Sequence, residues 1–243
     1  MKVERTTVRN VDVVELTSPV LGARCTLVVG TGDCVVVDPG AALADEVTAE
    51  AQARGLVVRA ILLTHGHADH TWDAGPLSAR LGVPVHVHAL DAYRLADPFG
   101  TLGELGHEPG GEGALAQVLR RAGVDPASYV PPAGLAVFGR TVGASGRSAD
   151  EVLAFGSVTL VARHAPGHTE GSTIYLAGDT ALSGDVLFAG TVGRTDLPGG
   201  DDRVMAATLR DVVAALPPTT RVLPGHGPAT DIARERHHNP YLR

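Results

Sequence analysis

Segment 65–70 of the chain reads HGHADH and places three imidazoles and one carboxylate directly after an apolar run. On an α-helix, the side chains of His65 and His67 would point about 200° apart. If both histidines bind one ion, the backbone must be extended or looped there, and Gly66 permits such a backbone. The same spacing lets the other two ligand-type residues of the segment reach a second ion, namely Asp69 and His70.

Three more ligand-type residues follow apolar strands further along the chain, namely His168, Asp185 and His226. Loops at the ends of strands in a common sheet can face one crevice, so we expect these segments to meet. Imidazole nitrogen and carboxylate oxygen suit zinc and other first-row metals. A lone histidine in a turn is usually an ordinary hydrogen-bonded residue, but ligand chemistry at so many strand ends predicts a metal centre.

Strand and helix patterns alternate along most of the chain. Apolar, β-branched runs between turn signals predict strands at 11–16, 25–29 and 35–37, and helical spacing predicts a helix over 41–54. Further strands are predicted at 60–63, 83–87, 158–162, 172–176 and 221–223, and further helices at 71–81, 204–216 and 231–238. Two halves that each mix strands with helices indicate an α/β fold.

Residues 90–147 interrupt this pattern, because they are rich in Gly and Pro and contain one clear helical stretch at 115–122. We interpret them as an insertion within one domain that spans residues 1–243. The insertion is either a lid over the site or a solvated surface excursion.

Composition and charge exclude several classes of protein. The chain has 243 residues, of which 44% are hydrophobic, enough for a sizeable core. Its 27 acidic and 20 basic residues give a net charge of −7, so no nucleic acid or membrane surface is expected as a partner. No stretch reaches the ~20 apolar residues of a transmembrane helix, and the N-terminus lacks the apolar core of a signal peptide. We expect a cytoplasmic protein.

The two cysteines, Cys25 and Cys34, are expected to stay unpaired. They flank a turn whose tip is Thr31 and Gly32, and this turn sets Val29 opposite Cys34. A reducing cytoplasm favours free thiols as well.

The order HxHxDH, then His, Asp and His, resembles the metallo-β-lactamase superfamily over nearly the whole chain. The resemblance implies an α/β fold, an αβ/βα four-layer sandwich of two mixed β-sheets with the metal site at one edge. It also implies two divalent metal ions, with zinc as the default and iron or manganese as options. One ion would be held by His65, His67 and His168, the other by Asp69, His70 and His226, with Asp185 bridging them.

Three further segments look like the glyoxalase-II-like (hydroxyacylglutathione hydrolase-like) branch of that superfamily: GRTDLPGG at 193–200, PGHGP at 224–228 and NPYLR at 239–243. This resemblance implies a hydrolase acting on a small-molecule thioester. Water bridging two ions would have a pKa lowered to about 7 and supply the attacking hydroxide, with Asp69 or Asp185 orienting it. We expect no additional C-terminal helical domain of the kind found in true glyoxalase II, so the resemblance leaves the thiol open, and it leaves the oligomeric state open as well.

Three alternatives stay open. The GRTD stretch is also similar to persulfide dioxygenases, mononuclear iron enzymes that typically carry PAHDY where this chain has PGHGP. A lactonase or another acyl hydrolase would use the same metals, because each reaction is hydroxide attack on an acyl carbon. The third alternative is a non-catalytic scaffold that keeps the ligands for stability.

Four residues are weaker candidates for roles around the metals. Asp38 resembles an aspartate that braces the metal-binding loop, or it is a simple turn or helix-capping residue. Arg194 and Asp196 either contact substrate or lock a loop as a partly buried ion pair. Arg243 either meets an acidic thiol or is a solvated terminal residue.

Overall fold

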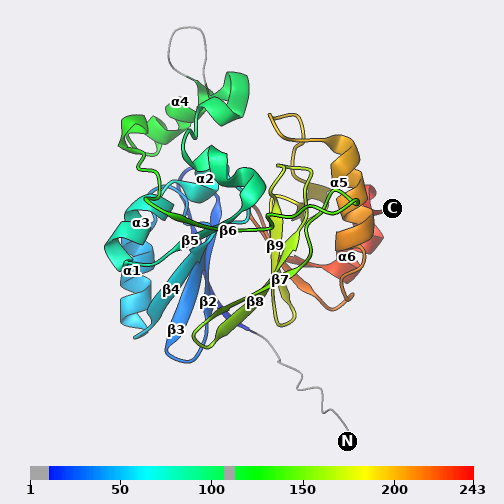
Figure 1. Cartoon of the computed structure of the whole chain (residues 1–243), viewed down its shortest axis with the longest axis horizontal. Helices are drawn as coiled ribbons and strands as arrows, with labels where there is room; N and C mark the ends of the chain where they lie inside the picture. Colours follow the sequence, from blue (N-terminus) through cyan, green and yellow to red (C-terminus); the bar gives the residue numbers. More distant parts are fainter. Residues whose placement is uncertain (1–10, 107–112) are drawn as a thin grey trace, which may run out of the picture.

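Two mixed β-sheets face one another, and helices cover the outer face of each sheet (Figure 1). The computed structural model describes residues 11–106 and 113–243. The first sheet has the order β1-β2-β3-β4-β5-β6, and the second has the order β14-β13-β10-β9-β8-β7. This arrangement confirms the predicted α/β sandwich.

The strands of the first sheet are β1 (Asp12–Thr17), β2 (Arg24–Val29), β3 (Asp33–Val37), β4 (Val57–Leu62), β5 (Val85–His88) and β6 (Leu135–Phe138). Those of the second are β7 (Glu151–Phe155), β8 (Val158–His164), β9 (Thr173–Ala177), β10 (Thr180–Gly184), β13 (Arg221–Pro224) and β14 (Thr230–Asp231). A small ribbon is formed by β11 (Leu187–Phe188) and β12 (Thr191–Val192).

The α-helices are α1 (Ala44–Ala53), α2 (Ala68–Thr71), α3 (Ala74–Leu81), α4 (Ala114–Arg121), α5 (Asp202–Thr208) and α6 (Ile232–His238). Short 3₁₀ turns are η1 (Ala89–Leu95), η2 (Gly100–Leu105), η3 (Pro126–Ser128) and η5 (Pro240–Leu242). A π-helical turn, η4 (Leu209–Val213), continues α5. The predicted helix over 204–216 is thus present with a change of pitch inside it.

Strand direction brings the functional loops to one edge of the sandwich. Strand β9 is antiparallel to both β8 and β10, and β10 is parallel to β13. The carboxyl ends of β8, β10 and β13 therefore point the same way, and in the other sheet β3, β4 and β5 are mutually parallel. Loops that follow these strands are placed to share a crevice.

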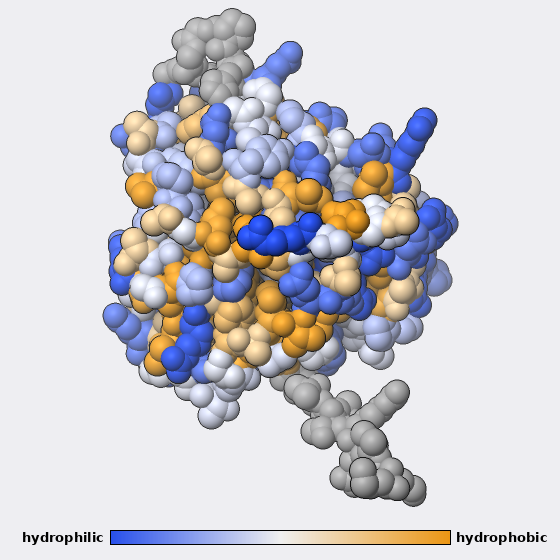
Figure 2. Space-filling model, viewed as in Figure 1, coloured by the Kyte–Doolittle hydropathy of each residue, from blue (hydrophilic) through white to orange (hydrophobic). Residues whose placement is uncertain are grey.

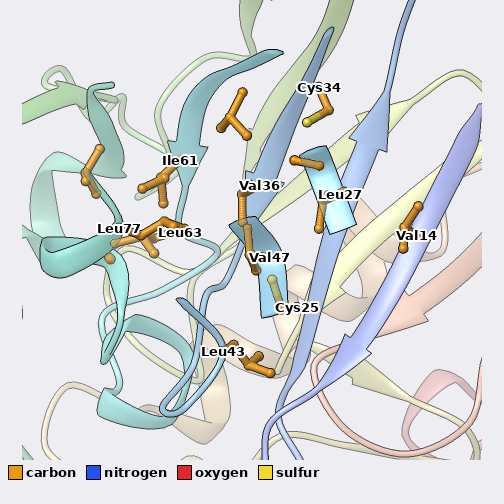
Figure 3. Close-up of a cluster of buried hydrophobic side chains, with 14 of the residues drawn as sticks. Val14, Cys25, Leu27, Cys34, Val36, Leu43, Val47, Ile61, Leu63 and Leu77 are labelled. Carbon is orange, nitrogen blue, oxygen red and sulfur yellow. The ribbon is translucent and has the colours of Figure 1, made fainter. Parts of the chain in front are cut away.

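Alternation along the strands divides the core into layers. In β3, the side chains of Cys34 and Val36 join a cluster with Leu43 and Val47, which lie just before and on α1 (Figure 3). The intervening residues of β3 face the second sheet. On the view in Figure 2, hydrophobic residues appear mainly toward the middle of the molecule and hydrophilic ones toward its edges. Among the described residues, no helix is long and apolar enough to span a bilayer.

The predicted pairing of the cysteine hairpin is confirmed. Val29 lies opposite Cys34 in the β2–β3 ladder, whereas Cys25 pairs with Leu16 on β1. Both cysteines are free and buried.

The segment at 90–147 differs in extent from the interpretation given above. It contains β6, which pairs in parallel with β5 as the edge strand of the first sheet. The part that leaves the sheet is therefore residues 89–134, of which 107–112 lie outside the described residues. This part packs onto the sandwich through a small hydrophobic cluster, in which Trp72 of the sandwich contacts Phe99 and Tyr129 with ring centroids 6.0 and 5.1 Å apart.

Candidate metal centre

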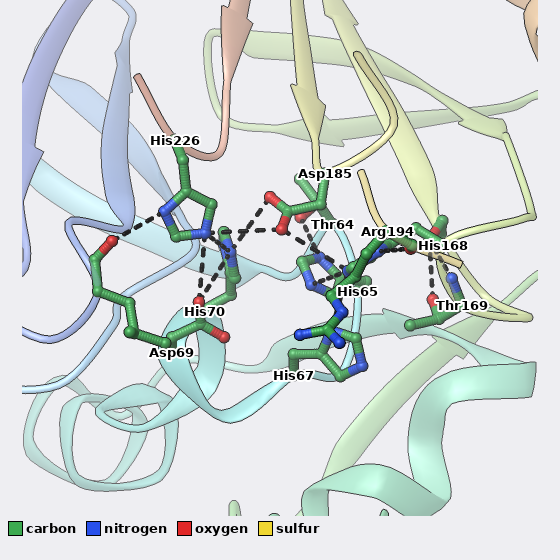
Figure 4. Close-up of polar contacts among 12 residues, drawn as sticks. Thr64, His65, His67, Asp69, His70, His168, Thr169, Asp185, Arg194 and His226 are labelled. Atoms are coloured by element: carbon green, nitrogen blue, oxygen red, sulfur yellow. Dashed lines mark hydrogen bonds and ion pairs between the residues drawn. The ribbon is translucent and has the colours of Figure 1, made fainter. Parts of the chain in front are cut away.

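Four loops of the sandwich carry the seven ligand-type side chains to one place (Figure 4). The loop after β4 holds two of them and runs into α2, which holds two more; the others follow β8, β10 and β13. His67 has extended backbone angles, φ −71° and ψ 146°, as the spacing predicted. The seven are His65, His67, Asp69, His70, His168, Asp185 and His226.

The first group consists of His65, His67 and His168, whose ligand atoms lie within 4.8 Å of one another. His168 Nε2 is 2.9 Å from His67 Nδ1 and 3.3 Å from His65 Nε2. All three side chains are buried. A single cation fits between three such nitrogens.

The second group consists of Asp69, His70 and His226, whose ligand atoms also lie within 4.8 Å. The Nε2 atoms of the two histidines are 3.1 Å apart, and His226 Nε2 is 3.2 Å from Asp69 Oδ2. Asp185 lies between the groups: its Oδ1 is 3.4 Å from His70 Nε2, and its Oδ2 is 3.6 Å from His168 Nε2. The Asp185 carboxylate is thus close to a histidine of each group, and its bridging role stays a prediction.

Hydrogen bonds to the far side of the ring orient two of the three histidines in the first group. His168 Nδ1 donates to the carbonyl of Arg194 at 2.7 Å. The Thr64 hydroxyl donates to Asp38 and therefore accepts from His65 Nδ1 at 3.1 Å. Because both rings carry their hydrogen on Nδ1, their Nε2 lone pairs face each other across 3.3 Å.

The second group shows the same arrangement. His70 Nδ1 donates to the Asp38 carboxylate, and His226 Nδ1 donates to the carbonyl of Leu21, each at 3.1 Å. Their Nε2 atoms are then left facing each other. Two lone pairs cannot share a hydrogen bond, so each contact requires a proton or a metal cation between the rings.

Two buried polar atoms at the centre have no hydrogen-bond partner, namely His67 Nε2 and Asp185 Oδ1. An unpaired carboxylate oxygen costs free energy when buried, unless a cation satisfies it. Together with the facing lone pairs, this orphaned oxygen shows that the residues present fit a pair of divalent cations.

The electrostatics keep most of the cluster in the form that binds cations. Burial lowers the pKa of His67 to about 3 and that of His65 well below its ordinary value, so both rings are neutral at pH 7. Burial opposes ionisation of Asp69, yet His70 and His226 hold its pKa below the usual range. Burial likewise opposes charge on His70, but Asp69 and then Asp185 raise its pKa well above normal. A proton and a metal ion thus compete for His70 Nε2.

A buried carboxylate that the sequence analysis did not single out, Asp91 on η1, fixes the ligand loops. It accepts hydrogen bonds from the main-chain N–H of Gly66 and of Gly171, both at 2.8 Å, and from the Thr169 hydroxyl at 2.7 Å. The fully buried guanidinium of Arg94 lies 3.4 Å from it. No spacing in the sequence singles out Asp91, because its role depends on which backbone N–H groups the fold brings to it.

Glycine is required at two points by close approach. A Cβ on Gly66 would lie 2.7 Å from the Arg94 side chain. The absence of a side chain at Gly66 therefore leaves room for Arg94, in addition to permitting the looped backbone. A Cβ on Gly225 would lie 2.2 Å from Asp185 Oδ1 and 2.7 Å from the His70 ring. The loop before His226 can approach the cluster only without a side chain at that position.

The four weaker candidates lie in different surroundings. Asp38 is buried, has a positive φ of 54°, and contacts Thr64 and His70, so it braces the loop in this structure. Arg194 and Asp196 form an exposed ion pair at 2.7 Å, and it is the Arg194 carbonyl that contacts a ligand-type histidine. The pair is not partly buried as one reading expected. Arg243 donates to the carbonyl of His237, outside the cluster.

A cavity of about 560 Å³ opens onto the cluster. Apart from members of the cluster, its described lining residues are apolar except for Arg194. A second cavity of about 570 Å³ is lined in part by Pro166, Arg203 and Thr208. None of the seven ligand-type residues lines it, although Gly167, the residue before His168, does.

Comparison with known proteins gives a family match across most of the chain. The family model described as the metallo-beta-lactamase superfamily matches residues 19–226. An uncharacterized protein of Mycobacterium leprae is 38% identical over 213 residues, covering 86% of this chain and 88% of its own. The probable metallo-hydrolase YqgX of Bacillus subtilis is 31% identical, and the match covers 90% of this chain and 92% of YqgX. The hydroxyacylglutathione hydrolase GloC of Haemophilus influenzae is 28% identical, covering 86% and 87%.

Solved structures of similar fold cover nearly the whole chain. The BLEG-1 B3 metallo-beta-lactamase superposes with a TM-score of 0.74 and 28% identity, covering 95% of this chain and 99% of its own. TTHA1623 in a di-iron-bound form superposes with a TM-score of 0.70 and 33% identity, covering 94% and 100%. ETHE1 from Myxococcus xanthus, at 23% identity and a TM-score of 0.69 over 94% and 83%, shares the fold.

Proposed function

The chain belongs to the metallo-β-lactamase superfamily, and on that premise we propose that it is a dinuclear metallohydrolase that cleaves a small-molecule thioester. The superfamily uses divalent metals, and this chain has two adjacent groups of ligand-type residues with Asp185 between them. We propose zinc as the default metal; iron, as in the di-iron form of TTHA1623, is the other candidate.

One observation carries the choice of a thioester, namely that no described group of the cavity would be free to protonate a leaving group once the histidines of the cluster, His226 included, hold metal. Among the described lining residues, the titratable side chains are members of the cluster and Arg194. The pKa values of Asp69 and Asp185 are both lowered by neighbouring histidines, despite burial, so neither carboxyl carries a proton at pH 7. A thiolate, whose thiol has a pKa of about 8.5, departs without protonation more readily than an amine or an alkoxide.

The residues divide the work of such a reaction. A bound metal pair supplies an activated water nucleophile and polarises the acyl carbonyl. Asp69 and Asp185 place two negative charges beside the imidazoles and accept hydrogen bonds from a water at the cluster. Asp38 and the Arg194 carbonyl hold His70 and His168 in the tautomer that points Nε2 inward. The apolar walls of the cavity exclude bulk water from the acyl carbon.

The comparisons support this proposal at the level of reaction class. YqgX is named as a probable metallo-hydrolase, and GloC is named for the hydrolysis of hydroxyacylglutathione, which is a thioester. The name of the BLEG-1 structure keeps β-lactams among the substrates to be tested.

The first test is metal content by elemental analysis of protein purified without added metal, with thioester hydrolysis measured on the same sample. We expect about two metals per chain and turnover that a chelator abolishes. Asp69→Ala should lower both metal content and activity, the latter by about 100-fold or more. Asp211→Ala, which removes an exposed carboxylate paired with Arg210, should change neither.

Other outcomes would overturn the proposal in distinct ways. One iron per chain with oxygen consumption on a persulfide would identify a dioxygenase. Turnover confined to a lactone or a β-lactam would identify another acyl hydrolase. Full stability loss on metal removal, with no turnover of any acyl substrate, would indicate a scaffold.

A further inference from the structure

The cavity above the cluster has a polar floor and an apolar wall. Asp69, His168, Asp185 and His226 form the floor at one end. An apolar wall comes from the part of the chain that leaves the first sheet: Leu102 and Leu105 of η2, and Leu115 and Val118 of α4. A volume of about 560 Å³ is in the range of sites that enclose a small organic ligand.

This wall is held in place by its own packing. Leu102 and Leu115 are more than 90% buried and belong to a cluster centred on Trp72, which follows directly after α2. Tyr129 contacts the Trp72 ring and donates from its hydroxyl to the carbonyl of Leu95 at 2.7 Å. Because α2 also carries Asp69 and His70, the wall and the cluster form one packed unit, and the cavity needs no closing motion to exist.

The mouth of the cavity offers little to an acidic substrate. Its cation among the described lining residues is Arg194, and both arms of that guanidinium already contact Asp196, at 2.7 and 2.8 Å. The net charge of the chain is −7. Arg243, the other basic residue considered for an acidic thiol, donates to His237 on α6 instead.

We propose that the thioester carries an extended apolar acyl group, a medium-length alkanoyl chain, which lies along Leu102, Leu115 and Val118 while its carbonyl meets the cluster. This inference rests on the proposed thioesterase function and names its substrate class. A short, hydroxylated acyl group on an acidic tripeptide thiol would leave the wall uncovered and find no free cation among the described residues of the mouth.

The test is a chain-length series on one small neutral thiol: acetyl, butanoyl, hexanoyl and octanoyl thioesters of N-acetylcysteamine, with S-lactoylglutathione alongside. Each buried methylene should raise kcat/KM about fourfold until the cavity is filled. Val118→Thr keeps the volume of the side chain but adds a hydroxyl to the wall. It should lower kcat/KM for the octanoyl thioester about fivefold and so flatten the dependence of kcat/KM on chain length.

Val130→Thr is the matched control, because Val130 lies in the same segment that leaves the first sheet, is 51% exposed and does not line the cavity. Metal content and thermal midpoint of each variant report on folding. A second readout avoids turnover: calorimetric binding of octanamide should weaken in Val118→Thr and not in Val130→Thr.

The outcomes separate the two proposals. If S-lactoylglutathione or the acetyl thioester is turned over as well as the octanoyl thioester, or if Val118→Thr leaves the chain-length preference intact, the inference of an apolar acyl group is wrong and the thioesterase stands. If the metal-loaded protein hydrolyses no thioester of any length, the proposed function fails and this inference fails with it.

Discussion

Asp91 accepts a hydrogen bond from the main-chain N–H of Gly66 at 2.8 Å, and so joins the start of segment 89–134 to the loop between His65 and His67. The same carboxylate holds Gly171 and Thr169, which follow His168. One buried side chain therefore sets the spacing between the two halves of the first ligand group. Arg94, fully buried beside it and paired also with Glu170, compensates its charge.

We expect Asp91→Asn to weaken metal binding about 10-fold to 100-fold and to lower the free energy of unfolding by about 1–3 kcal/mol. The amide has one acceptor oxygen where three donors converge, and its own NH₂ group would face another donor. Metal affinity by competition with a chromogenic chelator, and urea unfolding, measure the two effects. Asp97→Asn, an exposed residue that accepts from Gly100, is the control. Unchanged metal affinity in Asp91→Asn would contradict this role.

Asp38→Asn should weaken metal binding in both groups, because Asp38 Oδ2 accepts from the Thr64 hydroxyl as well as from His70 Nδ1. Asn tolerates the positive φ of 54° at this position, and its oxygen can still accept from the Thr64 N–H. Its NH₂ group then donates to His70 Nδ1, which moves the ring hydrogen to Nε2 and removes the lone pair that faces His226. The Thr64 hydroxyl loses its acceptor and can donate to His65 Nδ1 instead, which removes the inward lone pair of that ring as well. Elemental analysis should give fewer than two metals per chain.

Asp33→Asn is the control for this change, because Asp33 is another buried carboxylate, paired with Ser157 and Arg59 away from the cluster. It should retain two metals per chain. Two metals in Asp38→Asn would show that the tautomer of His70 is set by something other than Asp38.

The ligand-type residues could be predicted because their chemistry is local: residue type and position after an apolar strand suffice to single out His168 or His226. Asp91 could not be found in that way. It is 25 residues beyond Gly66, inside a segment whose Gly and Pro content indicated an insertion. Its role depends on which backbone N–H groups the fold brings to it, and no spacing in the sequence encodes that.

Strand prediction failed where burial overrides propensity. Strand β10, of sequence TALSG, is buried along its whole length in the middle of the second sheet, yet it contains Ser and Gly and no β-branched residue after Thr180. Such a strand is stabilised by neighbours on both sides, which a propensity pattern does not register. Strand β6, of sequence LAVF, was missed because it is only four residues long and lies in a segment whose Gly and Pro content indicated an insertion.

The metal-free chain should become less stable as the pH is lowered, partly because of His88 and His164. Their rings stack with centroids 4.0 Å apart, and both side chains are buried. Burial, and then His164, lowers the pKa of His88 to about 3 in the folded chain, against about 6.5 when unfolded. Between these values the unfolded chain binds more protons, so stability is full above pH 6.5 and is lost as pH falls.

His88→Gln removes this titration and should reduce the loss of unfolding free energy between pH 7.5 and pH 5 by about 1 kcal/mol, whatever its effect on stability at pH 7.5. Urea unfolding with a chelator present keeps metal release out of the comparison. His237→Gln, an exposed histidine on α6, should keep the slope of the parent chain. If the unfolding free energy of His88→Gln depends on pH as steeply as that of the parent chain, the His88 ring is protonated at little cost in the folded state.

Leu21 combines backbone strain with a place at the cavity mouth. Its φ is 56°, a region that a branched side chain adopts only at a cost, and its side chain is 55% exposed where it lines the cavity. Leu21→Asn should raise the free energy of unfolding by about 0.5–1 kcal/mol, since Asn tolerates this conformation. The carbonyl that holds His226 is kept, so metal content should not change.

The same substitution should lower kcat/KM for an octanoyl thioester about threefold, because it removes apolar surface from the mouth. Leu21→Ala is the matched variant, because it loses the same apolar contact. Ala does not have the local hydrogen bonds by which Asn tolerates a positive φ, so turnover should fall without a gain in the free energy of unfolding. Urea unfolding and turnover of both variants separate the two effects. A stabilised Leu21→Asn with undiminished turnover of the octanoyl thioester would show that the acyl chain does not pass this side of the mouth.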